Sequence, residues 1–277
     1  RFLPAEGGLN GPADRRLQNY IVARLGPLPG WTMSYGYDLF EWATPADLES
    51  WYGHMRQKMG ANHHLLGARS GKNSPDQPLE RADYSSYEQH RPNYSTYVET
   101  LERRPHKPSF SEDRFRVRSG YLLDDKDYDP ERTRRGFYHA TMAGGVGNIW
   151  GYLMGEHVTA NEGLRSSGDY PNCLELLNWK RFFATRFVPD MQRCNALTSG
   201  DAACLRSTDA GLIIVYREAT SELELGNLPA GRYTVLAVDT RTTHYKETPL
   251  GVVEGHGRLP TGAVSDWIIA LTRIPQP

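Results

Sequence analysis

Residues 31–68, WTMSYGYDLFEWATPADLESWYGHMRQKMGANHHLLGA, contain the pattern that decides the fold class. Residues 31–36 form a short apolar and aromatic run that predicts a buried strand. The segment 44–47, Thr-Pro-Ala-Asp, combines an N-cap residue with proline at the first helical position and predicts a helix to about Met59. Residues 64–68 predict a second buried strand. This succession indicates a parallel β/α unit.

The same alternation continues on both sides of this unit. It predicts three further helices and three further strands, the helices at 13–25, 94–103 and 129–143 and the strands at 84–88, 107–112 and 147–152. In the first helix, Leu17, Tyr20 and Ile21 share one face, the pattern of an amphipathic helix. These are five β/α units of roughly 25–30 residues, whereas a closed eight-fold barrel takes about 250 residues. Two architectures fit: a small open sheet, or a barrel whose first three units are absent from this chain.

The last third of the chain has a different character. Residues 174–197 predict a helix that packs against the preceding layer. Beyond Cys204 the pattern predicts only strands, at 212–216, 222–225, 233–238 and 267–273. We therefore expect a first domain over residues 1–200 and an antiparallel β domain over residues 205–277.

Composition excludes several classes of protein. The 277 residues carry 32 basic and 33 acidic side chains, a net charge of −1, which argues against nucleic-acid binding through bulk electrostatics. No apolar run is long enough to span a membrane. Of three cysteines, Cys194 and Cys204 could close one short loop, and Cys173 would then be left over, so the redox compartment stays open.

Polar residues that follow the predicted strands are the candidates for chemistry, because β/α barrels carry their active sites at the carboxyl ends of the strands. They are Asp38 and Glu41 after the first strand, Arg69 after the second, Glu88 and His90 after the third, and Glu112 and Asp113 after the fourth. A pair of carboxylates flanked by aromatic residues suits glycoside cleavage, at about 5–5.5 Å for retention or 6.5–9.5 Å for inversion of configuration. Ion pairs with nearby arginines explain the same acidic residues without catalysis.

Two other motifs give no cofactor or metal. The alternating aspartates of residues 124–129 lack the glycine and the distal glutamate of an EF-hand loop, so a solvated loop that leads into a helix cap is the better interpretation than a calcium site. Residues 144–147, Gly-Gly-Val-Gly, follow a helix and precede a strand, the reverse of a dinucleotide-binding motif. We therefore expect no cofactor.

Several segments together resemble the apiosidase-like glycoside hydrolases. They are LQNYIVAR at 17–24, WTMSYGYD at 31–38, KPSFSE at 107–112, the helix and strand within 134–151, and the strands within 215–241. The resemblance implies an α/β fold, a (β/α)8 TIM barrel of which this chain supplies about strands 4–8. It also implies that a small antiparallel β-sandwich follows, of the kind often described as collagen-binding.

The resemblance also implies roles for individual residues. The acid/base on the fourth strand falls on Asp38 and the nucleophile on the seventh falls on Glu112, a separation of 74 residues (112 − 38) that matches three β/α units. A further group is expected to contact the sugar: Tyr37, Glu41, Trp42, Arg69, Glu88, His90 and Trp150. Tyr37 stands where the family has glycine, which makes the rim beside Asp38 bulkier.

The expected function is therefore that of an exo-acting, retaining glycoside hydrolase that acts on a plant or microbial polysaccharide. Its expected partners are the carbohydrate and a missing N-terminal segment or second chain that supplies strands 1–3. The substrate class implies an extracellular or periplasmic location. Two alternatives remain: a carbohydrate-binding or scaffold protein without catalysis, and a polysaccharide lyase with Tyr87 and His90 as candidate bases.

Overall fold

The computed structural model describes residues 7–35, 42–70, 81–87, 93–103, 105–119, 129–145, 147–154 and 173–275. The chain divides into two compact units, one of residues 1–90 with 103–113 and one of residues 91–102 with 114–277. Among the helices in the described part of the chain, none is both long and apolar enough to cross a lipid bilayer.

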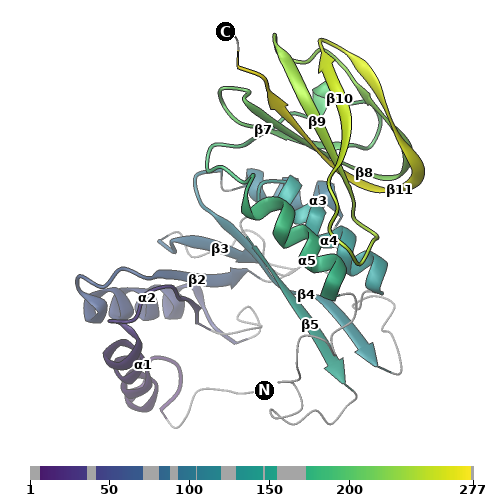
Figure 1. Cartoon of the computed structure of the whole chain (residues 1–277). Helices are drawn as coiled ribbons and strands as arrows, with labels where there is room; N and C mark the ends of the chain where they lie inside the picture. Colours follow the sequence, from purple (N-terminus) through teal and green to yellow (C-terminus); the bar gives the residue numbers. More distant parts are fainter. Residues whose placement is uncertain are drawn as a thin grey trace. The chain divides into compact units, whose positions relative to one another are not determined.

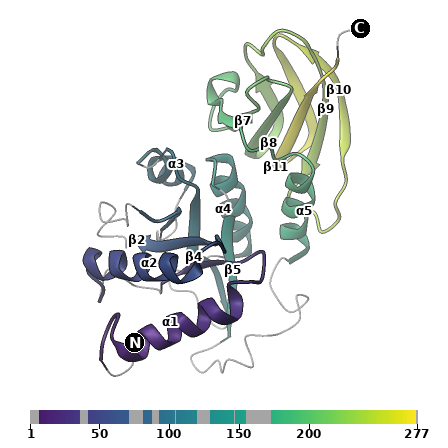
Figure 2. The ribbon, with the colours of Figure 1, turned by 90° about the vertical axis from the view of Figure 1, so that its left-hand side faces the viewer.

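The first unit is a parallel β/α layer (Figures 1 and 2). Its helices are α1 (Pro12–Leu25) and α2 (Pro45–Met59), and its strands are β1 (Thr32–Ser34), β2 (Leu65–Ser70), β3 (Tyr84–Tyr87) and the first part of β4 (Ser109–Ser119). Neighbouring strands pair in parallel in the order β1, β2, β3, β4. This confirms the predicted β/α alternation.

Helix α2 begins where the sequence predicts. The Thr44 side chain accepts a hydrogen bond from the Asp47 backbone N–H, the Asp47 side chain accepts one from the Thr44 backbone N–H, and Pro45 opens the helix. This capping box satisfies two backbone donors that the first turn would otherwise leave unpaired. The buried face of α2, which includes the fully buried Trp51, joins one core cluster with Leu66 of β2.

Helix α1 buries a face that only partly matches the one that its apolar residues suggest. Leu17 and Tyr20 are 56% and 60% exposed, whereas Gln18 and Val22 are buried. Gln18 tolerates burial because its amide donates to Asp14 Oδ2 at 3.0 Å and accepts from Arg15 at 2.8 Å. The apolar pattern correctly predicts the helix and part of the side that packs, because Ile21 is partly buried against the core cluster that contains Val22.

In the part of the chain that the structure describes, the second unit contains three α-helices and the remaining strands. Its helices are α3 (Tyr94–Glu102), α4 (Pro130–Met142) and α5 (Cys173–Ala184), and β5 (Gly147–Met154) follows β4 in the order of the first sheet. Asp129 caps α4, because its side chain accepts a hydrogen bond from the Arg132 backbone N–H at 2.7 Å.

An antiparallel sheet of six strands completes this unit, in the order β10-β9-β11-β8-β7-β6. The strands are β6 (Gln192–Arg193), β7 (Ala203–Arg206), β8 (Leu212–Leu225), β9 (Arg232–Asp239), β10 (Thr248–Glu254) and β11 (Gly257–Arg273). Alternate residues face opposite sides: Ile213 joins a core formed by the sheet itself, whereas Ile214 packs in a cluster with Tyr138 of α4 and Phe182 of α5. Both faces of the central strands are therefore buried.

Several predicted boundaries in this unit are wrong. The helix expected over 174–197 ends at Ala184, and Pro189 prevents it from continuing to residue 197 because proline has no backbone N–H to donate. The strands expected at 212–216 and 222–225 are one strand, β8, which stays paired with β11 across two register shifts. Strand β10 is not predicted. The domain boundary expected between residues 200 and 205 stays a prediction.

Candidate functional site

The register of the parallel sheet locates its carboxyl edge. Ser70 at the end of β2 pairs with Tyr87 at the end of β3, and Tyr87 pairs with Ser111 of β4. Glu112 directly follows Ser111 within β4. The active sites of β/α barrels lie at the carboxyl edge of the sheet. Glu112 is one residue beyond the position that pairs with the last residue of β3, where a catalytic residue is expected.

The other predicted site residues divide into two groups. Arg69 belongs to β2, level with Ser86 of β3, and Trp150 belongs to β5 in the second unit. The remaining predicted residues, apart from Trp42, lie outside the residues that the structure describes: Tyr37, Asp38, Glu41, Glu88 and His90. The separation of the Asp38 and Glu112 carboxyl groups therefore stays a prediction, as does the lyase alternative with His90.

Trp42 lies in an aromatic cluster that includes the residue directly after β1. Its ring is 6.1 Å from the ring of Tyr35, and Tyr35 stacks on the fully buried Trp51 at 5.0 Å. The Tyr35 hydroxyl donates to Asp14 Oδ2 at 2.6 Å, and burial together with this bond raises the pKa of Tyr35. The structure thus brings Tyr35 and Trp42 together in one aromatic cluster.

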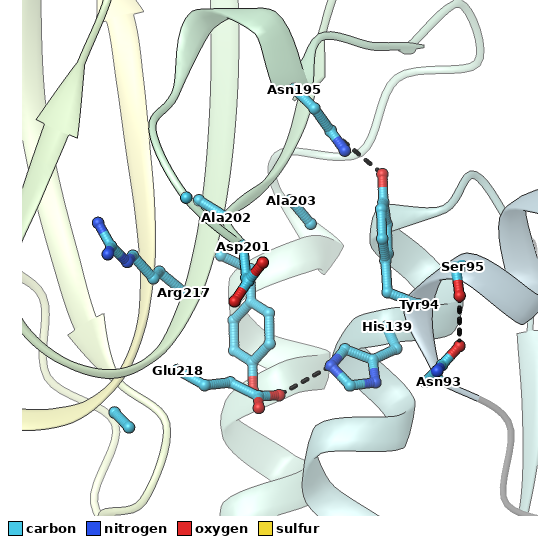
Figure 3. Close-up of a pocket in the computed structure, with 13 residues that line it drawn as sticks. Asn93, Tyr94, Ser95, His139, Asn195, Asp201, Ala202, Ala203, Arg217 and Glu218 are labelled. Atoms are coloured by element: carbon cyan, nitrogen blue, oxygen red, sulfur yellow. Dashed lines mark hydrogen bonds and ion pairs between the residues drawn. The ribbon is translucent and has the colours of Figure 1, made fainter.

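The second unit contains a polar pocket that the sequence does not predict (Figure 3). It has a volume of about 680 Å³ and is lined by residues from α3, α4, β8 and the segment that leads into β7. Tyr94 and Asn93 line one side, and Asp201 and Arg217 line the facing side. Because these residues come from four separate stretches of the chain, no local motif identifies them.

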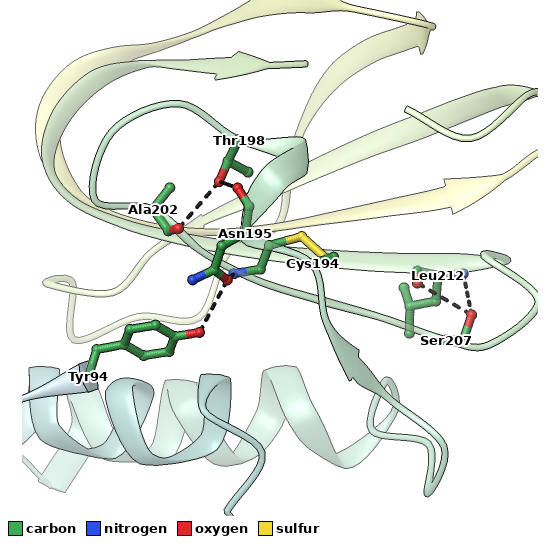
Figure 4. The surroundings of a disulfide bond; sticks show 8 residues. Tyr94, Cys194, Asn195, Thr198, Ala202, Ser207 and Leu212 are labelled. Atoms are coloured by element: carbon green, nitrogen blue, oxygen red, sulfur yellow. Dashed lines mark hydrogen bonds between the residues drawn. A yellow bond between two sulfur atoms is a disulfide. The ribbon is translucent and has the colours of Figure 1, made fainter. Parts of the chain in front are cut away.

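One sequence signal does point to this region, namely the pair Cys194 and Cys204. They form a disulfide, so the short loop that the sequence allows is closed (Figure 4). Asn195, next to the disulfide, accepts hydrogen bonds through Oδ1 from the Cys204 backbone N–H at 2.9 Å and from the Tyr94 hydroxyl at 3.1 Å. The disulfide loop therefore supplies one wall of the pocket.

Metal-binding groups are a separate question. Within the described ranges, no group of three or more His, Cys, Asp and Glu side chains is arranged to hold a metal ion. Of the aspartates at 124–129, only Asp129 is described, and it caps α4.

Comparison with known proteins gives structural similarity without sequence similarity. No protein family matches the sequence, and no curated protein matches it. A solved structure described as a glycoside hydrolase has a TM-score of 0.69 at 12% identity, over 95% of this chain and 69% of its own. A family 5 glycoside hydrolase from Bacteroides vulgatus has a TM-score of 0.71 at 11% identity, over 94% and 65%. A GH30 endoxylanase from Clostridium papyrosolvens has a TM-score of 0.57 at 13% identity, over 94% and 70%.

These neighbours establish the fold. The chain shares the TIM-barrel-like architecture of glycoside hydrolases, and it spans 69% and 65% of the length of the first two neighbours. Fold alone does not assign an activity, because one fold carries many chemistries.

Proposed function

We propose that this protein is a glycoside hydrolase in which Asp38 is the acid/base and Glu112 is the nucleophile. The observation that carries the proposal is that Glu112 directly follows Ser111, which pairs with the last residue of β3, in a fold shared with glycoside hydrolases. The resemblance of the sequence to the apiosidase-like family supports the same two residues.

Counting along the strands supports the pairing. Ser34 of β1 pairs with Gly67 of β2, and Gly67 pairs with Tyr84 of β3, so Ser34 and Tyr84 share one register. Asp38 follows Ser34 by four positions, and Glu88 follows Tyr84 by four positions. Ser85 of β3 pairs with Ser109 of β4. Glu88 follows Ser85 by three positions, and Glu112 follows Ser109 by three positions. By this count along the sequence, Asp38, Glu88 and Glu112 each follow residues of β1, β3 and β4 that share one register, which supports the proposal.

The proposed mechanism uses two carboxyl groups on opposite sides of the glycosidic bond. Asp38 donates a proton to the leaving oxygen while Glu112 attacks the anomeric carbon and forms a glycosyl-enzyme, which water then hydrolyses with Asp38 as base. The acid needs a raised pKa, and an apolar environment provides it. The aromatic cluster of Tyr35 and Trp42 supports such an environment.

The proposed substrate is a plant or microbial polysaccharide that is cut from its end, with retention of configuration. Arg69, Glu88 and His90 hold sugar hydroxyl groups, while Tyr37, Glu41, Trp42 and Trp150 shape the remainder of the binding site. This substrate class implies an extracellular or periplasmic protein.

The proposal includes the completion of the barrel. Strand β1 has three residues and is the first strand in the order of the parallel sheet. A further segment or a second chain that supplies strands 1–3 would pair with β1 and protect this edge. The antiparallel part over residues 205–277 is then the small β-sandwich domain beside a catalytic domain over 1–200.

The experiment that tests the function is hydrolysis of a panel of aryl glycosides and plant polysaccharides by the full-length protein. We expect Asp38→Asn to reduce hydrolysis by about 10²–10⁴-fold, because it removes acid/base catalysis. Glu112→Gln should abolish hydrolysis, and azide should restore glycosyl transfer, as the anomeric azide of inverted configuration, to Glu112→Ala. The exposed Glu99 of α3 supplies a matched control, Glu99→Gln, with unchanged activity.

Product analysis separates the alternatives. An unsaturated sugar that absorbs in the near ultraviolet would identify a lyase and would overturn the proposal. Binding of the polysaccharide without any reducing sugar released would identify a carbohydrate-binding protein, and would equally contradict it.

A further inference from the structure

The pocket in the second unit has the size and the construction of a ligand site (Figure 3). Its volume of about 680 Å³ falls within the roughly 300–1,000 Å³ of pockets that hold drug-sized ligands. Its walls are α3 on one side and the start of β7 with β8 on the other, with His139 of α4 between them. All of these residues belong to one compact unit.

Two charged side chains in this pocket are available to a ligand. Arg217 is partly buried and Asp201 is exposed, and neither has an ion-pair or hydrogen-bond partner for its side chain among the described residues. Gly200 allows this arrangement, because its φ of +64° suits glycine and a methyl group there would lie 3.3 Å from Arg217 Nη2. The loop therefore approaches the guanidinium closely without covering it.

Three other polar side chains of the pocket already have partners: His139, Glu218 and Tyr94. His139 Nε2 lies 2.8 Å from Glu218 Oε1, and Arg135 Nε lies 3.3 Å from Glu218 Oε2, so the Glu218 carboxylate is compensated. Tyr94 is held by its hydrogen bond to Asn195. Walls that are hydrogen-bonded in advance lose little freedom when a ligand binds, which favours affinity.

The chemistry that remains free matches a sugar ring. A sugar hydroxyl both donates and accepts hydrogen bonds, and Arg217 offers only donors while Asp201 offers only acceptors. Their charges cancel, which favours a neutral ligand over a uronate or a sulfated sugar. The pocket is also lined by the rings of Tyr94 and Tyr216, and an aromatic face suits the apolar face of a sugar ring.

We infer that this pocket is a second carbohydrate-binding site, which takes a short neutral oligosaccharide through Arg217 and Asp201. The site requires no catalysis, and its residues all belong to the second unit, whereas Asp38 and Glu112 belong to the first. A glycan held here would keep the protein on a polymer while the ends of that polymer are processed elsewhere.

The test is oligosaccharide binding to the full-length protein, read by hydrogen-exchange protection of residues 199–204 and 216–219. The probes are neutral xylo-, cello-, arabino- and galacto-oligosaccharides, each compared with oligogalacturonate. We expect at least one neutral probe to protect both segments, and expect Arg217→Gln and Asp201→Asn each to weaken that binding by about 10–100-fold. Arg241→Gln removes an exposed arginine outside the pocket and should leave binding unchanged.

Failure of this inference can be distinguished from failure of the proposed hydrolase activity, because the first is read as oligosaccharide binding and the second as hydrolysis. Hydrolysis of a small aryl glycoside should be unchanged in Arg217→Gln, whatever the fate of the Asp38 and Glu112 variants. Absence of protection with every neutral probe would overturn the inference, as would protection that persists in both pocket variants. Protection by oligogalacturonate alone would overturn the assignment to a neutral sugar.

Discussion

Arg134 of α4 and Asp266 of β11 form a buried ion pair, with 2.7 Å between Nη2 and Oδ2 and with side chains 4% and 0% exposed. The adjacent Arg135 donates to both oxygens of the same carboxylate at 2.8 and 3.0 Å, and the Ala219 backbone N–H donates at 2.9 Å. Four donors thus saturate the Asp266 carboxylate. Within the second unit, this network connects α4 to β11, a central strand of the antiparallel sheet.

Asp266→Asn should destabilise the second unit strongly. The change leaves two guanidinium groups beside a neutral amide, and breaking a buried pair in this way costs about 3–5 kcal/mol. Because Arg134 keeps Glu175 at 3.2 Å, we expect a loss near the lower figure, about 3 kcal/mol, in chemical denaturation. Asp201→Asn is the matched control, since Asp201 is exposed, and its stability should equal that of the unchanged protein.

Stability should also fall in acid through the same carboxylate. Burial alone would raise the pKa of Asp266, but hydrogen bonds from Arg135, the Ala219 backbone and Arg134 outweigh burial and lower the pKa to about 2. A lowered pKa stabilises the folded state above the usual value of 3.8, and this stabilisation disappears as the pH falls from about 4 to about 2.

The contribution is about 2 kcal/mol for a shift of this size. Urea denaturation at pH 6, 4 and 2 measures it. Between pH 4 and pH 2, the free energy of unfolding should fall less steeply in Asp266→Asn than in the unchanged protein. Equal slopes in the two proteins would show that other carboxylates control acid unfolding.

Local signals made part of this fold predictable. Thr44 and Asp129 mark the starts of α2 and α4 because an N-cap acts on backbone groups within three residues. The buried face of α1 was only partly predictable, since the burial of Gln18 depends on how its amide is paired and on what packs above it. Secondary structure follows from near neighbours, whereas packing follows from residues that are distant in sequence.

The same distinction applies to the two sites. Glu112 could be proposed from its place at the end of the predicted strand 107–112, because the carboxyl ends of parallel strands meet at one edge of a sheet. In the structure it lies within β4, which continues to Ser119. The pocket of Tyr94, Asp201 and Arg217 could not be proposed, because it exists only once β8 pairs in a sheet and packs near α3. The Arg134–Asp266 pair joins residues that are 132 positions apart and has no sequence signature either.

The capping box of α2 gives a prediction for the first unit. Thr44→Ala removes the side-chain acceptor for the Asp47 N–H and should lower the free energy of unfolding by about 1 kcal/mol. Thr44→Ser retains the hydroxyl group and should stay close to the unchanged protein. Hydrogen exchange of the α2 backbone amides at increasing urea concentration measures the loss within this unit. Equal losses in both variants would point to the lost methyl group rather than to the cap.

The disulfide gives the last prediction. Cys194 and Cys204 are separated by 10 residues, and a cross-link that closes so short a loop contributes about 2–3 kcal/mol by restricting the unfolded chain. Replacing both with serine should lower the free energy of unfolding by that amount, and a reductant should destabilise the unchanged protein but not the double variant. Because Asn195 adjoins the bond and holds Tyr94, hydrogen exchange should also accelerate at residues 195–204. A thermal midpoint that a reductant leaves unchanged in the natural protein would contradict the closed loop, since an intact cross-link must respond to its removal.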